Sequence, residues 1–92
     1  MRLLIVEDEK ELCDTVAKSL YGAGYEVDTC YDGDEALDYI LSDDYDLIVL
    51  DLNLPGTDGM DILRELRKKN EETKVLILSA RSQIADKVEG LD

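Results

Sequence analysis

The sequence predicts an α/β fold, a doubly wound parallel sheet with helices on both faces. Short apolar runs alternate four times with segments whose apolar residues recur every three or four positions, within only 92 residues. Most of these runs are free of polar residues, as expected for strands that are covered on both faces. Strands that alternate with helices favour a parallel sheet. A chain of this length holds one small domain, predicted to span residues 1–92.

The first half of the chain is predicted to form two strand–helix units. Residues 3–6 are a continuous apolar strand, and residues 26–31 alternate apolar and polar positions as a second strand. A first helix over 9–23 and a second over 34–42 follow them, each with an apolar stripe. The expected stripes are Leu12, Cys13, Val16, Ala17 and Leu20 in the first helix, and Ala36, Leu37, Ile40 and Leu41 in the second.

The second half repeats this order. Residues 46–50 and 74–79 are apolar runs predicted to be the third and fourth strands. A third helix over 60–69 ends in a basic turn, which suits the negative end of its dipole, and a fourth helix is predicted over 82–91. The apolar positions expected to pack are Ile62, Leu63 and Leu66 in the third helix, and Ile84, Val88 and Leu91 in the fourth.

Composition limits the classes of function. The net charge is −13, so the chain would repel phosphate backbones, and we expect no nucleic acid binding by this segment. The two cysteines, Cys13 and Cys30, form no zinc motif, and both are predicted to be buried free thiols. Neither a signal peptide nor a membrane-length apolar run is visible, which favours a cytoplasmic protein without membrane contact.

Acidic residues follow two of the predicted strands. Glu7 and Asp8 come after the first strand, Asp51 comes after the third, and Ser79 ends the fourth. Ligands of doubly wound sheets bind at the carboxyl ends of the strands, near the point where strand order reverses. If the first and third strands are neighbours, the three carboxylates converge, and their repulsion should raise at least one pKa. Mg²⁺ would relieve this repulsion, with the backbone carbonyl of Asn53 as a further ligand.

A carboxylate beside such a cation can act as a nucleophile toward phosphoryl groups, to which Ser79 could donate a hydrogen bond. Each residue alone also has an ordinary structural interpretation. Asp51 is then a turn residue, Ser79 a loop or cap residue, and Glu7-Asp8 the cap of the following helix. Their joint placement at the ends of successive apolar strands favours the functional interpretation.

The stretches LLIVED at 3–8, LIVLDLNLPGTDG at 47–59 and VLILSAR at 75–81 resemble the receiver domain of two-component response regulators. The resemblance covers the whole chain and is greatest to receivers that carry a winged-helix DNA-binding output domain. It implies a flavodoxin-like fold and phosphorylation of Asp51 by a sensor histidine kinase, which would dock on the first helix. The chain would be a phosphoacceptor rather than an enzyme, although the family assists its own phosphotransfer and dephosphorylation.

The same resemblance implies roles for the other residues of the site. Asp8 would bind Mg²⁺ directly, Glu7 directly or through water, and Asn53 through its carbonyl, with Asp51 as a further ligand. Ser79 would contact the phosphoryl group, and Ala80 would leave room beside it.

The chain departs from a complete receiver at its end. It stops at Gly90-Leu91-Asp92, so we expect four strand–helix units with strand order 2-1-3-4, without the fifth strand, its lysine and the fifth helix. None of Lys68, Lys69, Lys74 and Lys87 stands at a position that matches the missing lysine. The expected consequences are weaker phosphotransfer, an unpaired fourth strand, and a homo-oligomer that covers the exposed apolar surface.

Three other functions remain open at this point. A flavodoxin-like electron carrier with FMN fits the fold and acidity, but the loop EDEKE is too acidic to cradle a phosphate. A hydrolase of the haloacid type would need a second carboxylate where Asn53 stands. The chain could also be a truncated or engineered assembly fragment without phosphorylation.

Overall fold

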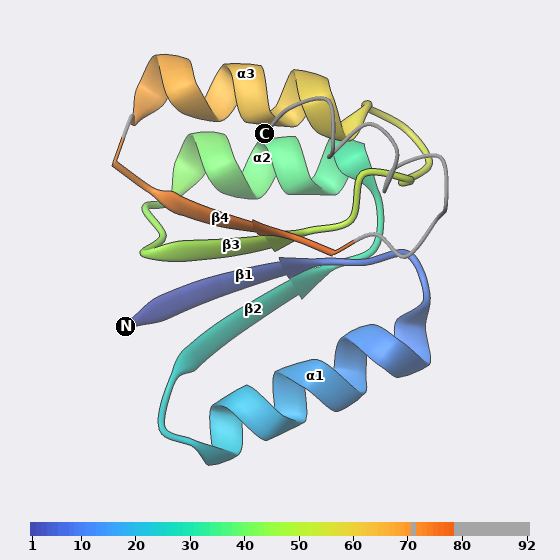
Figure 1. Ribbon diagram of the computed structural model, residues 1–92, viewed down its shortest axis with the longest axis vertical. Helices are drawn as coiled ribbons and strands as arrows, with labels where there is room; N and C mark the ends of the chain where they lie inside the picture. Colours follow the sequence, from blue (N-terminus) through green and yellow to red (C-terminus); the bar gives the residue numbers. More distant parts are fainter. Residues whose placement is uncertain (71, 79–92) are drawn as a thin grey trace.

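The computed structural model describes residues 1–70 and 72–78, which form four parallel strands and three helices (Figure 1). The sheet has the order β2-β1-β3-β4. This topology confirms the predicted α/β fold and the strand order 2-1-3-4. The strands are β1 (Arg2–Val6), β2 (Glu26–Cys30), β3 (Leu47–Leu50) and β4 (Lys74–Ile77), and the helices are α1 (Lys10–Gly22), α2 (Gly33–Ser42) and α3 (Gly59–Lys69).

The helices cover both faces of the sheet. Helix α1 lies on one face, and α2 and α3 lie side by side on the other (Figure 1). The larger core is between the sheet and α2 and α3, where Leu4, Ile48 and Leu50 meet Ile40 and Ile62. A smaller core beneath α1 is built on Ile5, Cys13 and Val49. Strand β1 is therefore buried from both sides, which explains its continuous apolar run.

Element boundaries agree with the sequence predictions to within one residue, except that β4 ends at Ile77, two residues before the predicted end. Two packing predictions were wrong. Leu12 is 44% exposed and Leu41 is 53% exposed, although both were expected in apolar stripes. Cys13, next to Leu12, and Ile40, next to Leu41, are fully buried instead. Successive side chains of an α-helix point about 100° apart, so the residue beside a buried one can face solvent. The predicted helix over 82–91 lies outside the described residues.

The cysteine prediction is confirmed, since Cys13 and Cys30 are both buried and both free. Burial raises the pKa of Cys13 to about 11 and that of Cys30 to about 12, so both thiols stay protonated near neutral pH. None of the helices in the described part of the chain is long and apolar enough to cross a membrane.

Strand β4 is much more exposed than the other strands. It pairs with β3 and is the last strand in the described sheet. Leu76, Ile77 and Leu78 are 52%, 41% and 38% exposed. Apolar side chains therefore reach solvent at this margin of the sheet.

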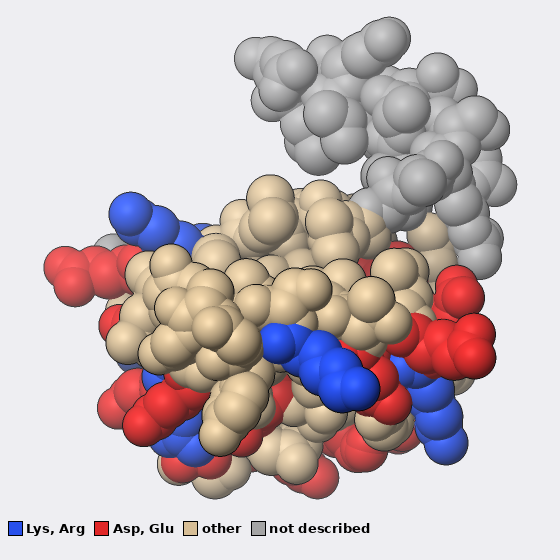
Figure 2. Space-filling model, turned by 90° about the horizontal axis from the view of Figure 1, so that it is seen from below, with Lys and Arg blue, Asp and Glu red and all other residues tan. Residues whose placement is uncertain are grey.

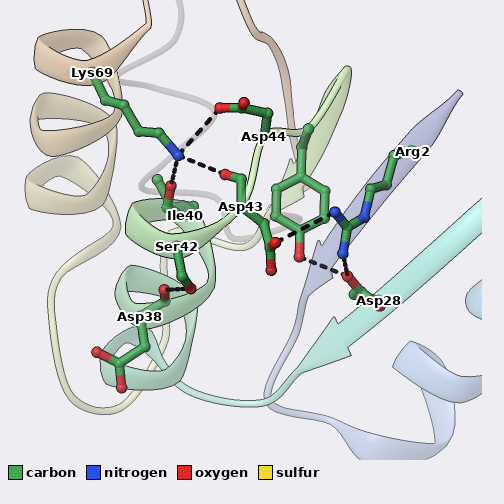
Figure 3. A network of polar contacts seen from close by, with 9 residues as sticks. Arg2, Asp28, Asp38, Ile40, Ser42, Asp43, Asp44 and Lys69 are labelled. Atoms are coloured by element: carbon green, nitrogen blue, oxygen red, sulfur yellow. Dashed lines mark hydrogen bonds and ion pairs between the residues drawn. The ribbon is translucent and has the colours of Figure 1, made fainter.

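A polar network lies at the amino ends of the strands (Figure 3). Arg2 pairs with Asp28 at 3.1 Å and with Asp43 at 3.5 Å, and its guanidinium stacks over the Tyr45 ring. The buried Tyr45 hydroxyl donates to Asp28 at 2.7 Å. Lys69 donates to the backbone carbonyls of Ile40 and Asp43, both at 2.6 Å. These contacts join β1, β2, α2 and α3 at the edge opposite the carboxyl ends.

Candidate functional site

The candidate site forms where β1 and β3 end side by side. Val6 is paired with Leu50, so the next residue of each strand, Glu7 and Asp51, emerges at the same edge of the sheet. The ladder continues past both strands, because the Asp51 N–H donates to the Val6 carbonyl at 3.0 Å and the Glu7 N–H donates to the Cys30 carbonyl at 3.1 Å. The backbones of both acidic residues are thereby fixed by the sheet.

Three carboxylates converge at this edge, as the sequence predicted. Glu7, Asp8 and Asp51 each offer an oxygen, and the three oxygens lie within 4.8 Å of one another. Glu7 is 8% exposed, Asp51 is partly buried and Asp8 is exposed to solvent. The cluster is therefore anchored in the core on one side and open to solutes on the other.

The carboxyl group of Glu7 has a strongly shifted pKa. Its pKa is raised from 4.5 to about 7; burial is the largest cause, and Asp51 and Asp8 add to the increase. A hydrogen bond from the Glu9 N–H to the Glu7 carboxylate, at 3.1 Å, opposes this shift. The expectation of a raised pKa is confirmed, but desolvation contributes more than the repulsion from which it was predicted.

The loop after β3 starts at the cluster. The Asp51 carboxylate accepts a hydrogen bond from the Asn53 N–H at 2.9 Å, which orients the carboxylate and draws the loop back toward the strand end. Asn53 is partly buried in this loop. Of the predicted site residues, Glu7, Asp8, Asp51 and Asn53 therefore gather at one edge, while Ser79 and Ala80 lie outside the described residues.

The capping interpretation of Glu7-Asp8 has limited support in this structure. The residue that precedes α1 is Glu9, and its own side chain makes no cap hydrogen bond. The Glu7 carboxylate binds the Glu9 N–H, one residue ahead of the helix. Asp8 remains exposed beside Asp51 and is available to a solute.

Asp34 and Thr57, for which the sequence predicted no role, meet beside the same loop. No local pattern could pair them, since they are 23 positions apart in the chain. A hint was present in the Asp-Gly-Asp and Pro-Gly-Thr turns, because tight turns of this kind let two backbones approach closely.

The donor set suits a hard divalent cation. Carboxylate oxygens are the ligands that Mg²⁺ prefers, and it needs only a few protein ligands because it retains water. Three acidic side chains in one open cluster, with a loop beside them that can offer backbone carbonyl oxygens, meet this requirement.

Comparison with known proteins decides the family. The model of the "Response regulator receiver domain" matches residues 3–92. The chain belongs to this family of response regulator receiver domains. The transcriptional regulatory protein DltR of Streptococcus agalactiae is 47% identical over all 92 residues, which are 41% of its length. The chain thus spans less than half the length of the curated relatives it matches, which are named as transcriptional regulatory proteins and response regulators.

Solved receivers share the fold. The receiver domain of Francisella response regulator 1452 is 37% identical, with a TM-score of 0.83 over 98% of this chain and 74% of that chain. The response regulator TrrA of Thermotoga maritima, solved in complex with Mg²⁺ and BeF, is 28% identical, with a TM-score of 0.72 over 99% of this chain and 98% of that chain. Membership of the receiver family favours a signalling domain over the electron carrier and the hydrolase considered from the sequence.

Proposed function

We propose that this receiver accepts a phosphoryl group on Asp51 from the phosphohistidine of a sensor histidine kinase, with Mg²⁺ held at the acidic cluster. The observation that carries the proposal is the convergence of Glu7, Asp8 and Asp51 within 4.8 Å at the ends of two adjacent strands. The Mg²⁺–BeF complex of the related TrrA supports it, since BeF mimics a phosphoryl group.

Asp51 is the proposed nucleophile because its backbone is fixed by the sheet and its carboxylate is oriented by Asn53. One carboxylate oxygen attacks phosphorus, the P–N bond of the donor breaks, and its electron pair stays on the imidazole, which takes up a proton. Mg²⁺, when bound, neutralises charge on the phosphoryl oxygens. Asp8, Asp51 and the Asn53 carbonyl are the proposed ligands, with Glu7 binding directly or through water; Ser79 and Ala80 keep their proposed place beside the phosphoryl group.

The direct test is labelling with acetyl phosphate, a small donor that needs no kinase. We expect the protein to gain one phosphoryl group in Mg²⁺, with the acyl phosphate on Asp51 by peptide mapping, and to gain none in excess EDTA. Asp51→Asn should remain unlabelled, whereas Asp61→Asn, which alters an exposed carboxylate of α3, should label normally. Equal labelling of wild type and Asp51→Asn would overturn the proposal.

We propose α1 as the docking surface of the kinase. Figure 2 looks onto the face that carries α1, where uncharged side chains fill much of the middle and acidic ones gather around the rim. Leu12, on the first half of α1, is 44% exposed and lies a few residues from Asp8. Leu12→Lys should slow transfer from a phosphorylated kinase without changing labelling by acetyl phosphate. An equal loss with both donors would contradict docking at this position.

Two further proposals concern partners. A second copy of the chain is proposed to cover the exposed apolar residues at the end of β4 and directly after it, namely Leu76, Ile77 and Leu78. The whole protein is proposed to regulate transcription, as the names of its relatives indicate. The net charge of −13 makes this segment a poor ligand for DNA, so any DNA contact is proposed to lie in further sequence of the whole protein.

A further inference from the structure

The first turn of α2 is tied to the loop that runs from β3 to α3. The Gly33 N–H donates to the Pro55 carbonyl at 2.9 Å. One oxygen of the Asp34 carboxylate accepts from both the Thr57 N–H, at 3.1 Å, and the Thr57 hydroxyl, at 2.5 Å. Three hydrogen bonds therefore connect two turns that are far apart in sequence, and we call this set the Asp34–Thr57 clamp.

Two glycines make this close approach possible. A Cβ atom on Gly33 would lie only 1.9 Å from the Thr57 carbonyl oxygen, so no other residue fits there without moving the loop. Gly56 has a φ of +82°, and a Cβ on it would lie 3.2 Å from the Asp34 carboxylate. At Gly33 the loop thus rests directly on the backbone of the first turn of α2.

The clamped loop is the one that carries the site. It begins at Asp51, whose N–H is bound to β1, and it includes Asn53, whose N–H is bound to the Asp51 carboxylate. At its other end, the Asp58 side chain caps the first turn of α3 by accepting from the Met60 N–H. The clamp holds Thr57 between these two fixed ends. It therefore limits the path available to residues 52–56, including the orientation of the Asn53 peptide.

We infer that Asp34 is a positioning residue for the cation site, acting through Thr57 on the loop that presents the Asn53 carbonyl. The inference rests on the proposed function, because it assumes that this carbonyl binds Mg²⁺ beside Asp8 and Asp51. Asp34 acts as a hydrogen-bond acceptor, and its negative charge is incidental. It is not one of the three carboxylates of the acidic cluster.

The test is Mg²⁺ affinity, measured by titration of the apo protein with amide NMR. Asp34→Ala removes the acceptor and Thr57→Val removes the hydroxyl donor. Both should weaken Mg²⁺ binding by about tenfold, the low end of what loss of a supporting contact costs a metal site. Asp34→Asn keeps an acceptor oxygen without the charge, and Thr57→Ser keeps both donors. Both conservative variants should bind Mg²⁺ within about twofold of wild type, which is far below that supporting-contact loss.

A structural role alone would give a different pattern. Tyr45→Phe, at the opposite edge of the sheet, should lower stability and leave Mg²⁺ affinity unchanged. Asp61→Ala, which alters an exposed first-turn acid of α3, should do the same. If Asp34→Ala does not fold, the pair Thr57→Val and Thr57→Ser decides the question. The inference is overturned if Asp34→Ala and Thr57→Val bind like wild type, or if Asp34→Asn is as weak as Asp34→Ala.

The same titration separates this inference from the proposed function. Asp51→Asn removes a proposed ligand and should weaken Mg²⁺ binding more than any clamp variant. If Asp51→Asn binds Mg²⁺ as tightly as wild type, the proposed site itself is wrong. If Asp51→Asn is weak while Asp34→Ala and Thr57→Val bind normally, the site stands and only the role of the clamp is wrong.

Discussion

Folding and metal binding favour opposite protonation states of the Glu7 carboxyl group. Glu7 is 8% exposed and its carboxyl group lies beside two other carboxylates, so below about pH 7 the folded protein without metal favours the protonated form. A cation favours the ionised form. The metal-free fold is therefore more stable with Glu7 neutral, whereas metal binding is stronger with Glu7 ionised.

This conflict predicts a pH dependence for the apo protein. In the unfolded chain Glu7 ionises near 4.5, whereas in the fold its pKa is raised to about 7. Between these values the folded state binds more protons, so its stability falls as pH rises from about 5 to 7. The part due to Glu7 is about 1–3 kcal/mol.

Glu7→Gln isolates this contribution, since the amide oxygen can still accept from the Glu9 N–H. Urea unfolding in EDTA at pH 5 and pH 7.5 should show a smaller loss of stability for Glu7→Gln than for wild type. In Mg²⁺ the wild type should instead show the smaller loss of stability, because the variant loses a ligand. Identical pH profiles of the two proteins in EDTA would contradict the raised pKa.

At the scale of elements, the ends of the strands perform different tasks. The carboxyl ends gather negative charge, while the amino ends are closed by the network of Arg2, Asp28 and Tyr45 (Figure 3). Lys69, at the end of α3, donates to the backbone carbonyls of Ile40 and Asp43 at the end of α2. The basic last turn of α3 was predicted to stabilise the dipole of α3, and it also caps α2. The amino-end network keeps β1 and β2 in place while the opposite edge carries like charges.

Tyr45→Phe tests this closure. The change removes the hydroxyl that donates to Asp28 at 2.7 Å but keeps the buried ring, so unfolding free energy should fall by about 1 kcal/mol. Tyr21→Phe is a matched control, because Tyr21 is 74% exposed and should be neutral. Thermal and urea unfolding measure both. A Tyr45→Phe protein as stable as wild type would show that the hydroxyl contributes nothing net.

The sequence predicted the elements well because burial on one or both faces leaves a periodic signal. It indicated Glu7, Asp8 and Asp51 because they stand at the carboxyl ends of apolar strands. Leu12 and Leu41 were misplaced because a stripe read from spacing alone is wider than the surface that a helix buries. The Asp34–Thr57 clamp could not be predicted, since it depends on how two distant turns meet in space.

For the whole molecule, the main feature is the contrast between an acidic surface and an apolar margin. The net charge of −13 keeps molecules apart, whereas Leu76 and Ile77 on β4, with Leu78 directly after it, favour contact. Salt screens the repulsion and leaves the apolar attraction intact. Association through β4 should therefore increase with ionic strength.

Leu76→Lys tests this association. Wild type should sediment as a mixture of monomer and dimer at high micromolar concentration in moderate salt, and the variant should remain monomeric. Leu41→Lys, which changes a side chain of similar exposure on α2, should behave like wild type. A wild-type protein that stays a compact monomer under these conditions would contradict the proposed contact between copies.

The most direct test of the central claim is titration with Mg²⁺ and beryllofluoride, a mimic of the phosphoryl group, followed by amide NMR. If Glu7, Asp8 and Asp51 form one site, both additions together should shift the amides of Asp8, Asp51 and Asn53, and these shifts should be absent in Asp51→Ala. Spectra of the wild type that do not change, or that change equally in Asp51→Ala, would contradict a phosphorylation site at this edge of the sheet.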